Sequence, residues 1–334
     1  MMRPSAANAY NKAGPFSSEG VGFHFVGTRA DFRISKGEAM VFKKVIRLLQ
    51  NRRTARKGVW ARWVGKNWAH LTYAVRVEPT WLEVNRLDIP VASLPASFAG
   101  FKIVQMTDFH GSRSVTSEYL DEAVALAQEQ AGDVIVLTGD FVHKGNRHVE
   151  RVANSLGRLR APHGVFAVLG NHDFSVRNPL GVRRFPNLHR EVGDALAAKD
   201  IYVLRNESVP LQRGAQTLHL TGMEDLWSRE CDLEASFAGL PTDQPRVVLA
   251  HNPLTVELLA GRRCDLMLSG HTHGGQVMVP GLGRIALGPG GRKFSAGLYR
   301  VGKTWLYVNK GIGHGVPIRY RVRPEVAVFT LRPD

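Results

Sequence analysis

The sequence has few of the features that stabilise small secreted proteins or that direct a chain into or across a membrane. It contains only two cysteines, Cys231 and Cys264, which lie far apart and form no C-x-x-C pair. We therefore expect no disulfide framework, and we expect the protein to reside in a reducing compartment. No stretch approaches the roughly 18 continuous apolar residues of a transmembrane helix, and the first residues lack the apolar core of a signal peptide. We expect a cytoplasmic protein.

Acidic residues are also scarce near the N-terminus. Residues 1–100 hold 16 Lys and Arg against 6 Asp and Glu, a net charge of +10, whereas the whole chain of 334 residues carries +15. This asymmetry indicates an anionic partner for the first part of the chain. We expect a flexible N-terminus over residues 1–37, a basic amphipathic helical arm over residues 38–75 and one main domain over residues 76–334.

The expected arm combines positive charge with apolar and aromatic stripes. Nine Lys and Arg and no acidic residue occur between residues 43 and 66. At helical spacing lie two apolar stripes, formed by Phe42, Val45, Ile46 and Leu49 and by Trp60, Trp63, Val64, Trp68 and Leu71. Such a helix is typical of binding to an anionic membrane surface, which we rank first for residues 42–71. Packing against the main domain ranks second, and nucleic-acid binding ranks third.

The main domain alternates apolar runs with helical patterns. Runs over 101–106, 134–138 and 165–169 predict buried strands, and helices are expected from residue 117, over 149–159 and over 191–199. This alternation indicates a parallel sheet covered by helices, in the α/β class. A strand pair is expected over residues 75–89. The short alternating strands after Gly281 suggest a second sheet facing the first, which would give a four-layer α/β/β/α sandwich.

Side chains that can bind metal ions follow five apolar segments, each where the expected strand ends. The candidates are Asp108, His110, Asp140, Asn171, His251, His271 and His273. The carboxyl ends of parallel strands share one edge of a sheet, where ligands bind. Each residue alone has an ordinary explanation, because Asp and Asn often cap helices or form turns. Five such sites in succession are hard to explain in that way.

The candidate ligands form a chemically coherent set. Two carboxylates, one amide oxygen and four imidazoles suit Mn²⁺, Fe²⁺ or Zn²⁺ better than Ca²⁺. Seven ligands are too many for one catalytic ion that keeps an open position. They suit two divalent metal ions that share one carboxylate. A pair of ions about 3.5–4 Å apart can activate water and hold the oxygens of a phosphoryl group.

The order of these motifs resembles the calcineurin-like metallophosphoesterase superfamily. They are Asp-x-His at 108–110, Gly-Asp at 139–140, Gly-Asn-His-Asp at 170–173, His251, and Gly-His-x-His at 270–273. The GHTHGGQ segment, with SAGLY and NKGIG further on, is most similar to the YkuE/YaeI-type branch, which includes UDP-2,3-diacylglucosamine pyrophosphatases of lipid A biosynthesis. The resemblance covers about residues 100 to 330 and implies the metallophosphoesterase sandwich.

The resemblance also implies roles for individual residues. One ion would be bound by Asp108, His110 and His273, the other by Asn171, His251 and His271, and Asp140 would bridge the two. His172 matches the catalytic histidine of the family, which protonates the leaving oxygen or stabilises its charge. Asp173 would orient the His172 ring. A structural alternative is that His172 only orients Asn171.

The expected function is metal-dependent hydrolysis of a phosphodiester or pyrophosphate bond by activated water. The basic, Trp-bearing arm and the resemblance together favour an amphiphilic, lipid-linked substrate at the inner face of the membrane, similar to UDP-2,3-diacylglucosamine. One alternative is a soluble phosphodiesterase that acts on nucleotides or nucleic acid. Another is a metal-binding scaffold without activity, against which the complete ligand set and His172 argue.

One further segment interrupts the alternation of strands and helices. Residues 174–190 contain two prolines and five basic side chains, counting His189. Lying just after Asp173, this loop is suited to hold an anionic substrate. A solvated loop with no binding role is an equally good interpretation. The sequence alone assigns no substrate-binding residue.

The membrane interpretation predicts a change in vesicle binding when the arm is removed. The complete chain is expected to float with vesicles of anionic phospholipid, and a chain without residues 1–75 is expected to stay with the soluble fraction, because the basic residues near such a surface contribute about 1 kcal/mol each. Flotation in a density gradient measures both. Equal flotation of the two chains would contradict a membrane role for the arm.

Overall fold

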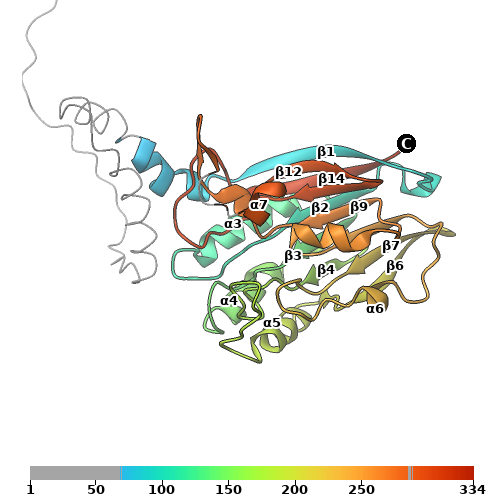
Figure 1. Cartoon of the computed structure of the whole chain (residues 1–334), viewed down its shortest axis with the longest axis horizontal. Coiled ribbons are helices and arrows are strands. Elements are labelled where there is room, and N and C mark those ends of the chain that lie inside the picture. Colours follow the sequence, from blue (N-terminus) through green and yellow to red (C-terminus); the bar gives the residue numbers. More distant parts are fainter. Residues whose placement is uncertain (1–67, 69, 285–286, 288) are drawn as a thin grey trace, which may run out of the picture. The chain divides into compact units, whose positions relative to one another are not determined.

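A computed structural model describes residue 68, residues 70–284, residue 287 and residues 289–334 (Figure 1). The expected flexible N-terminus (1–37) and most of the expected arm (38–75) lie outside these residues. The described end of the arm is helical over residues 70–76. Trp68 and Leu71 there are 66% and 45% exposed. Within the described ranges, no helix is both long and apolar enough to cross a membrane.

The first sheet contains six strands in the order β1-β14-β2-β3-β4-β5. Four neighbouring strands, β2 to β5, run parallel, and β14 is antiparallel to β2 and parallel to β1. The strands are β1 (Glu83–Val91), β2 (Lys102–Met106), β3 (Val134–Thr138), β4 (Val165–Val168), β5 (Ile201–Val203) and β14 (Glu325–Pro333). Three helices follow strands of this sheet, namely α3 (Ser117–Gln128), α4 (Val149–Leu156) and α5 (Leu188–Ala197).

The second sheet also contains six strands, in the order β12-β13-β9-β8-β7-β6. Strands β13, β9, β8 and β7 run parallel, and the edge strands β12 and β6 are antiparallel to their neighbours. The strands are β6 (Glu207–Arg213), β7 (Gln216–Gly222), β8 (Arg246–Leu249), β9 (Leu266–Ser269), β12 (Gly297–Val301) and β13 (Thr304–Val308). The shorter elements are η1 (Glu78–Thr80), η2 (Ala96–Phe98), α6 (Leu233–Phe237), η3 (Pro253–Leu259), η4 (His273–Gly275), β10 (Met278–Val279), β11 (Gly283–Arg284) and α7 (Pro289–Lys293).

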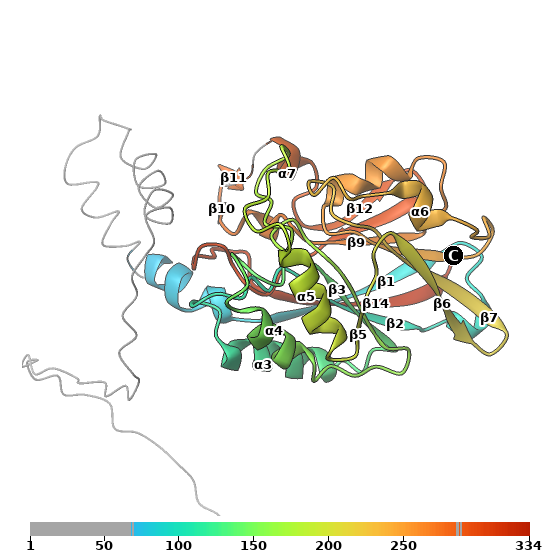
Figure 2. The same cartoon turned by 90° about the horizontal axis from the view of Figure 1, so that it is seen from below.

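Three apolar clusters separate four layers. On β3, Val134 and Val136 face the second sheet, whereas Ile135 and Leu137 face the helices α3 to α5. On β9, Leu266 and Leu268 join the cluster between the sheets, and the residue between them joins a third cluster under α6 and η3. The successive layers are visible from below (Figure 2). Because such strands are buried on both faces, they read as continuous apolar runs.

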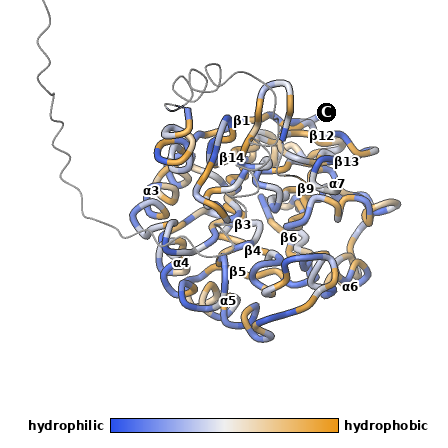
Figure 3. The backbone as a smooth tube through the Cα atoms, turned by 60° about the vertical axis from the view of Figure 1, so that its left-hand side comes forward, coloured by the Kyte–Doolittle hydropathy of each residue, from blue (hydrophilic) through white to orange (hydrophobic). Residues whose placement is uncertain are grey.

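The resulting architecture is the predicted α/β/β/α sandwich. Hydrophilic residues occupy much of α5 and α6 on the outside (Figure 3), while the apolar side chains between the layers are removed from water. Burial contributes about 1.5–3 kcal/mol for each large aliphatic side chain. Helices α3, α4 and α5 confirm the helical segments expected from residue 117, over 149–159 and over 191–199, with ends that differ by up to three residues.

Two predictions about the strands are wrong. Residues 75–89 do not form a strand pair, because the chain is helical to residue 76, passes through η1 and then forms only β1. Pro79 fixes its own backbone torsion and lacks an N–H, and buried Glu78 accepts the backbone N–H of Val322 instead of extending a strand. The tail does not lie wholly in the second sheet either. Only β12 and β13 do, whereas β14 inserts into the first sheet between β1 and β2.

Candidate metal centre

The seven predicted ligands come from the carboxyl ends of strands in both sheets. Asp108 and His110 follow β2, Asp140 follows β3 and Asn171 follows β4, all in the first sheet. The other three follow strands of the second sheet, namely His251 after β8 and His271 and His273 after β9. The five strand ends predicted from sequence are thus present, and they are divided between two facing sheets.

Hydrogen bonds join the strand ends of one sheet to those of the other. The Nδ1 atom of His251 lies 2.7 Å from the carbonyl oxygen of Thr138, at the end of β3. The backbone N–H of His271 donates to Asp108 Oδ2 at 3.0 Å. A carbonyl oxygen can only accept, so Nδ1 of His251 donates a hydrogen to it, and Nε2 is the ring atom that can bind an ion.

Three of the side chains form one compact group. The Nε2 atoms of His110 and His273 are 2.8 Å apart, and they lie 3.8 Å and 3.2 Å from Asp108 Oδ1. All three side chains are buried. Ligands bound at about 2.0–2.2 Å to a single ion are separated by roughly 3–3.5 Å. The spacing in this group is therefore close to that of ligands around one divalent ion.

A second group lies next to the first and shares a carboxylate with it. Asp140 Oδ2 is 3.4 Å from His110 Nε2 and 3.2 Å from His251 Nε2. Nearby, the Nδ1 atom of His271 is 2.9 Å from Asn171 Oδ1. The other oxygen of Asp140 accepts the backbone N–H of His172 at 2.9 Å, which fixes the carboxylate with Oδ2 between the two histidines.

Burial and nearby charges set the pKa of each of the four histidines among the candidate ligands. Burial lowers the pKa of His110 and His273 well below the usual value, and it lowers the pKa of His271 to about 4. These imidazoles are therefore neutral at neutral pH and keep a lone pair. Burial also lowers the pKa of His251, but the charge of Asp140, the hydrogen bond to Asp140 and the charges of Asp108 and Asp225 together outweigh burial and raise this pKa to about 10. An ion bound there would replace that proton.

The backbone is strained at five of the seven predicted ligands. The φ angles are +54° at Asp108, +47° at His110, +56° at Asp140, +73° at His271 and +50° at His273. Left-handed backbone costs residues other than glycine about 1–2 kcal/mol each. Strain of this kind concentrates at functional sites, where the surrounding structure enforces it. Positive φ angles recur after β2, β3 and β9. This recurrence indicates that the conformation of these turns serves to position the candidate ligands.

Two glycines allow the strand ends to approach the carboxylates. A Cβ atom on Gly170 would lie 2.3 Å from Asp140 Oδ1, and one on Gly270 would lie 2.2 Å from Asp108 Oδ2. Neither position has a positive φ. The need for glycine is therefore one of space, since any side chain would push a carboxylate out of place.

Asp173 has a different position from the predicted one. Its carboxylate is fully buried and accepts the backbone N–H groups of residues 140, 141, 142 and 170 at 2.9–3.2 Å. These contacts hold the turn after β3 against the turn after β4. The Nδ1 atom of His172 lies instead 2.8 Å from the carbonyl oxygen of His143. The prediction that Asp173 orients the His172 ring is wrong, because the carbonyl group of His143 contacts that ring and Asp173 contacts backbone N–H groups instead.

Two residues around the centre were not predicted from the sequence. Nδ1 of His143 is 3.4 Å from Nδ1 of His110, on the side of that ring away from Asp108, and its carbonyl orients His172. A histidine three residues after a strand-end aspartate was the available signal. Arg319 is fully buried, and it donates to the carbonyl groups of residues 310, 311, 313 and 322. Nothing in the sequence distinguished it from its basic neighbours.

The loop that Arg319 holds supports the first group of ligands. The backbone N–H of Gly313 donates to the carbonyl oxygen of Asp108 at 2.7 Å, and that of Ile312 donates to the carbonyl oxygen of Thr107 at 2.9 Å. The loop therefore closes over the turn after β2. This contact makes the segment between β13 and β14 part of the candidate centre.

A two-sheet α/β sandwich with a paired group of buried carboxylates and imidazoles between its strand ends defines a metallophosphoesterase. Residues 101–275 match the calcineurin-like phosphoesterase family, and the chain belongs to that family. The resemblance stated from the motifs is thus confirmed. Members of the family use two divalent metal ions, and the groups of candidate ligands described above fit such a pair.

The chain is similar over most of its length to several known proteins. It is 32% identical to the metallophosphoesterase YkuE of Bacillus subtilis, over 78% of this chain and 89% of that one. It is 34% identical to the phosphodiesterase YaeI of Escherichia coli, over 76% and 90%. It is 27% identical to the UDP-2,3-diacylglucosamine pyrophosphatase LpxG of Chlamydia muridarum, over 77% and 91%.

The crowding at Gly270 predicts weaker metal binding when a methyl group is added. In Gly270→Ala, the new Cβ atom would displace Asp108, so fewer than two ions per chain are expected after dialysis against a low concentration of Mn²⁺. Gly193→Ala is the matched control, because a Cβ atom there meets nothing within 4 Å. Elemental analysis measures the ions. A full complement of metal in Gly270→Ala would show that Asp108 need not stay in this position.

Proposed function

We propose that the chain is a hydrolase with a dinuclear centre in which Asp140 bridges two ions. The supporting observation is the position of Asp140 Oδ2, at 3.4 Å from His110 Nε2 and 3.2 Å from His251 Nε2. One ion is assigned to Asp108, His110 and His273, and the other to Asn171, His251 and His271. In this assignment the alternate histidines His271 and His273 serve different ions. Mn²⁺, Fe²⁺ and Zn²⁺ all suit this mixture of oxygen and nitrogen ligands.

His172 is proposed as the catalytic group that acts on the leaving oxygen. Its Nδ1 atom is engaged by the carbonyl oxygen of His143 at 2.8 Å, so exchange of a proton with a substrate falls to Nε2. Its ring lies edge-on to the ring of His110, with centroids 4.7 Å apart, which places it beside the metal ligands. When bound, the two ions would supply activated water and offset the charge on the phosphoryl oxygens.

The proposed substrate is an amphiphilic, lipid-linked phosphoester or pyrophosphate similar to UDP-2,3-diacylglucosamine, as in lipid A biosynthesis. One support is the similarity to LpxG, whose substrate is of this kind. A second is the basic sequence between residues 43 and 66, together with the exposure of Trp68 and Leu71 in the described end of the arm. These features favour a peripheral position on the cytoplasmic face of the membrane. Similarity to the phosphodiesterase YaeI supports a second candidate, a soluble phosphodiesterase.

The assigned roles predict different effects for two substitutions. His172→Ala is expected to keep both ions and to lower kcat for bis-p-nitrophenyl phosphate with Mn²⁺ by about 100-fold or more, because general acid catalysis contributes about 10²–10⁴-fold. Asp140→Ala is expected to lose metal as well as activity, because the bridge is removed. Colorimetric rates and elemental analysis measure the two effects.

His163→Ala is the control for these variants, since His163 precedes β4 at the end away from Asn171. It is expected to keep both metal and activity. An unaltered metal content in Asp140→Ala would contradict the ligand assignment. Metal loss in His172→Ala would instead make His172 a support for Asn171.

The substrate proposal predicts a preference that can be measured directly. With Mn²⁺, the complete chain is expected to cleave UDP-2,3-diacylglucosamine into UMP and a lipid phosphate, with a higher kcat/KM than for bis-p-nitrophenyl phosphate. Mass spectrometry identifies the products. A preference for the simple phosphodiester would favour the soluble phosphodiesterase. Bound metal without turnover of either compound, in any divalent metal, would favour a scaffold.

A further inference from the structure

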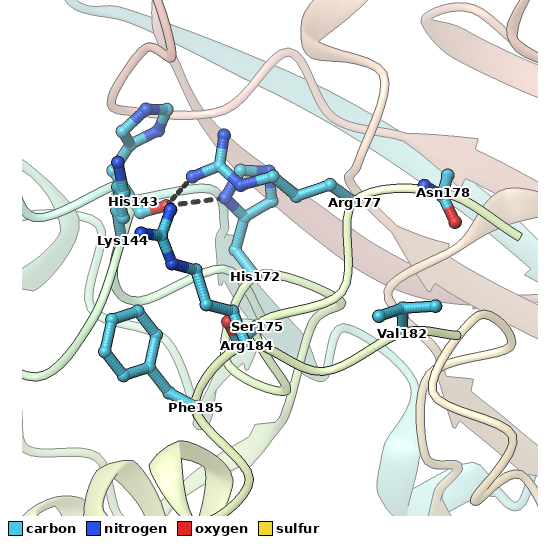
Figure 4. A pocket seen from close by; sticks show the side chains of 9 residues that line it. All are labelled: His143, Lys144, His172, Ser175, Arg177, Asn178, Val182, Arg184 and Phe185. Atoms are coloured by element: carbon cyan, nitrogen blue, oxygen red, sulfur yellow. Dashed lines mark hydrogen bonds between the residues drawn. The ribbon is translucent and has the colours of Figure 1, made fainter. Parts of the chain in front are cut away.

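A cavity of about 330 Å³ opens beside the ring of His172 (Figure 4). One wall is formed by His143 and Lys144, on the segment that follows β3, and the other by residues 175–185 of the loop that follows β4. This volume lies in the range of small-molecule sites, which begins at about 300 Å³. The loop whose role the sequence left open therefore borders the candidate centre.

The charge of this cavity is unbalanced. It is lined by three cations, Lys144, Arg177 and Arg184, and within the described ranges no carboxylate lines it. None of the three forms an ion pair with a carboxylate of the described residues, whereas Arg183 in the same loop pairs with Glu230 at 2.6 Å. Arg183 is thus neutralised within the fold, and the charge of the other three is left for a ligand. The matching ligand is an anion.

One of these cations is tied to the proposed catalytic histidine. The Nη2 atom of Arg177 donates to the carbonyl oxygen of His143 at 2.9 Å, and Nδ1 of His172 approaches the same oxygen at 2.8 Å. The guanidinium group and the imidazole ring therefore lie side by side at one acceptor (Figure 4). The proposed function places the leaving oxygen at His172. An anion held by Arg177 would consequently belong to the leaving group.

We infer that this cavity binds a second phosphate, joined to the scissile one through the oxygen that leaves, so that the bond cleaved is a pyrophosphate. This inference rests on the proposed function. In the reaction, water oxygen bonds to the attacked phosphorus, the bridging P–O bond breaks, and the bridging oxygen departs on a phosphate monoester, with the proton of His172 or as a dianion. Lys144, Arg177 and Arg184 bind that monoester. An alcohol leaving group would bring no second phosphate for these cations.

The inference is tested by comparing two substrates in the complete, Mn²⁺-loaded chain. Diadenosine 5′,5′-pyrophosphate carries the second phosphate, and bis-p-nitrophenyl phosphate does not. In Arg177→Gln, the ratio of kcat/KM for the pyrophosphate to kcat/KM for the phosphodiester is expected to fall about 10-fold to 100-fold, as for the loss of one hydrogen bond between charged groups. Lys144→Gln is expected to lower the same ratio. Arg190→Gln, an exposed cation of α5 that does not line the cavity, is expected to leave it unchanged.

Inhibition by AMP gives an independent measure, because AMP is the leaving monoester. Its inhibition constant against bis-p-nitrophenyl phosphate is expected to rise about 10-fold or more in Arg177→Gln and to stay constant in Arg190→Gln. Equal losses with both substrates would overturn the inference and make Arg177 a support for His143. A dinucleotide joined by a single phosphodiester provides a further comparison. If Arg177→Gln lowered its kcat/KM, relative to that of bis-p-nitrophenyl phosphate, as much as it lowered that of the pyrophosphate, the inference would also be overturned. An unaltered chain that cleaves none of these compounds would refute the proposed function itself.

Discussion

The contact between the two sheets is the constraint on which the candidate centre depends. Four of its seven side chains follow strands of the first sheet, and three follow strands of the second. Neither sheet alone brings together the Nε2 atoms of His110 and His273, which are 2.8 Å apart. Their approach is fixed by the apolar cluster between the sheets and by the hydrogen bond from His251 to the end of β3. Packing that stabilises the fold is therefore the same packing that sets the distances among the ligands.

Around this contact, the tertiary structure holds several residues in backbone conformations that they would rarely adopt in an isolated turn. Five predicted ligands have left-handed backbone torsions, and each of these is unfavourable outside a supporting framework. The framework consists of side chains that bind the backbone around the candidate ligands. Asp173 ties the turns after β3 and β4 together through four backbone N–H groups, and buried Arg319 holds the loop that closes over Asp108. The chemistry proposed for His172 depends on the same framework, since a backbone carbonyl group orients its ring.

The sequence predicted the parts of this structure that depend on local pattern. Continuous apolar runs identified β2, β3, β4, β8 and β9, because strands buried on both faces need no polar side, and the residues after each run gave all seven candidate ligands. It could not assign those strands to two sheets, since pairing such as that of Ala327 with Gln105 leaves no local signal. It also misplaced the contact of Asp173. A carboxylate that accepts backbone N–H groups and one that orients a histidine look alike in sequence, and only the tertiary arrangement distinguishes them.

The position of β14 bears on how the centre comes into existence. This strand is the last element of the chain, yet it lies inside the first sheet, with β1 on one side and β2 on the other. The strand that leads into Asp108 and His110 therefore gains its second neighbour only after more than 200 intervening residues have been synthesised. Closing so long a loop is slow, because the entropy is lost before the strand pairs form. The turn that carries Asp108 and His110 therefore takes its place in the complete sheet only once β14 has paired with β2.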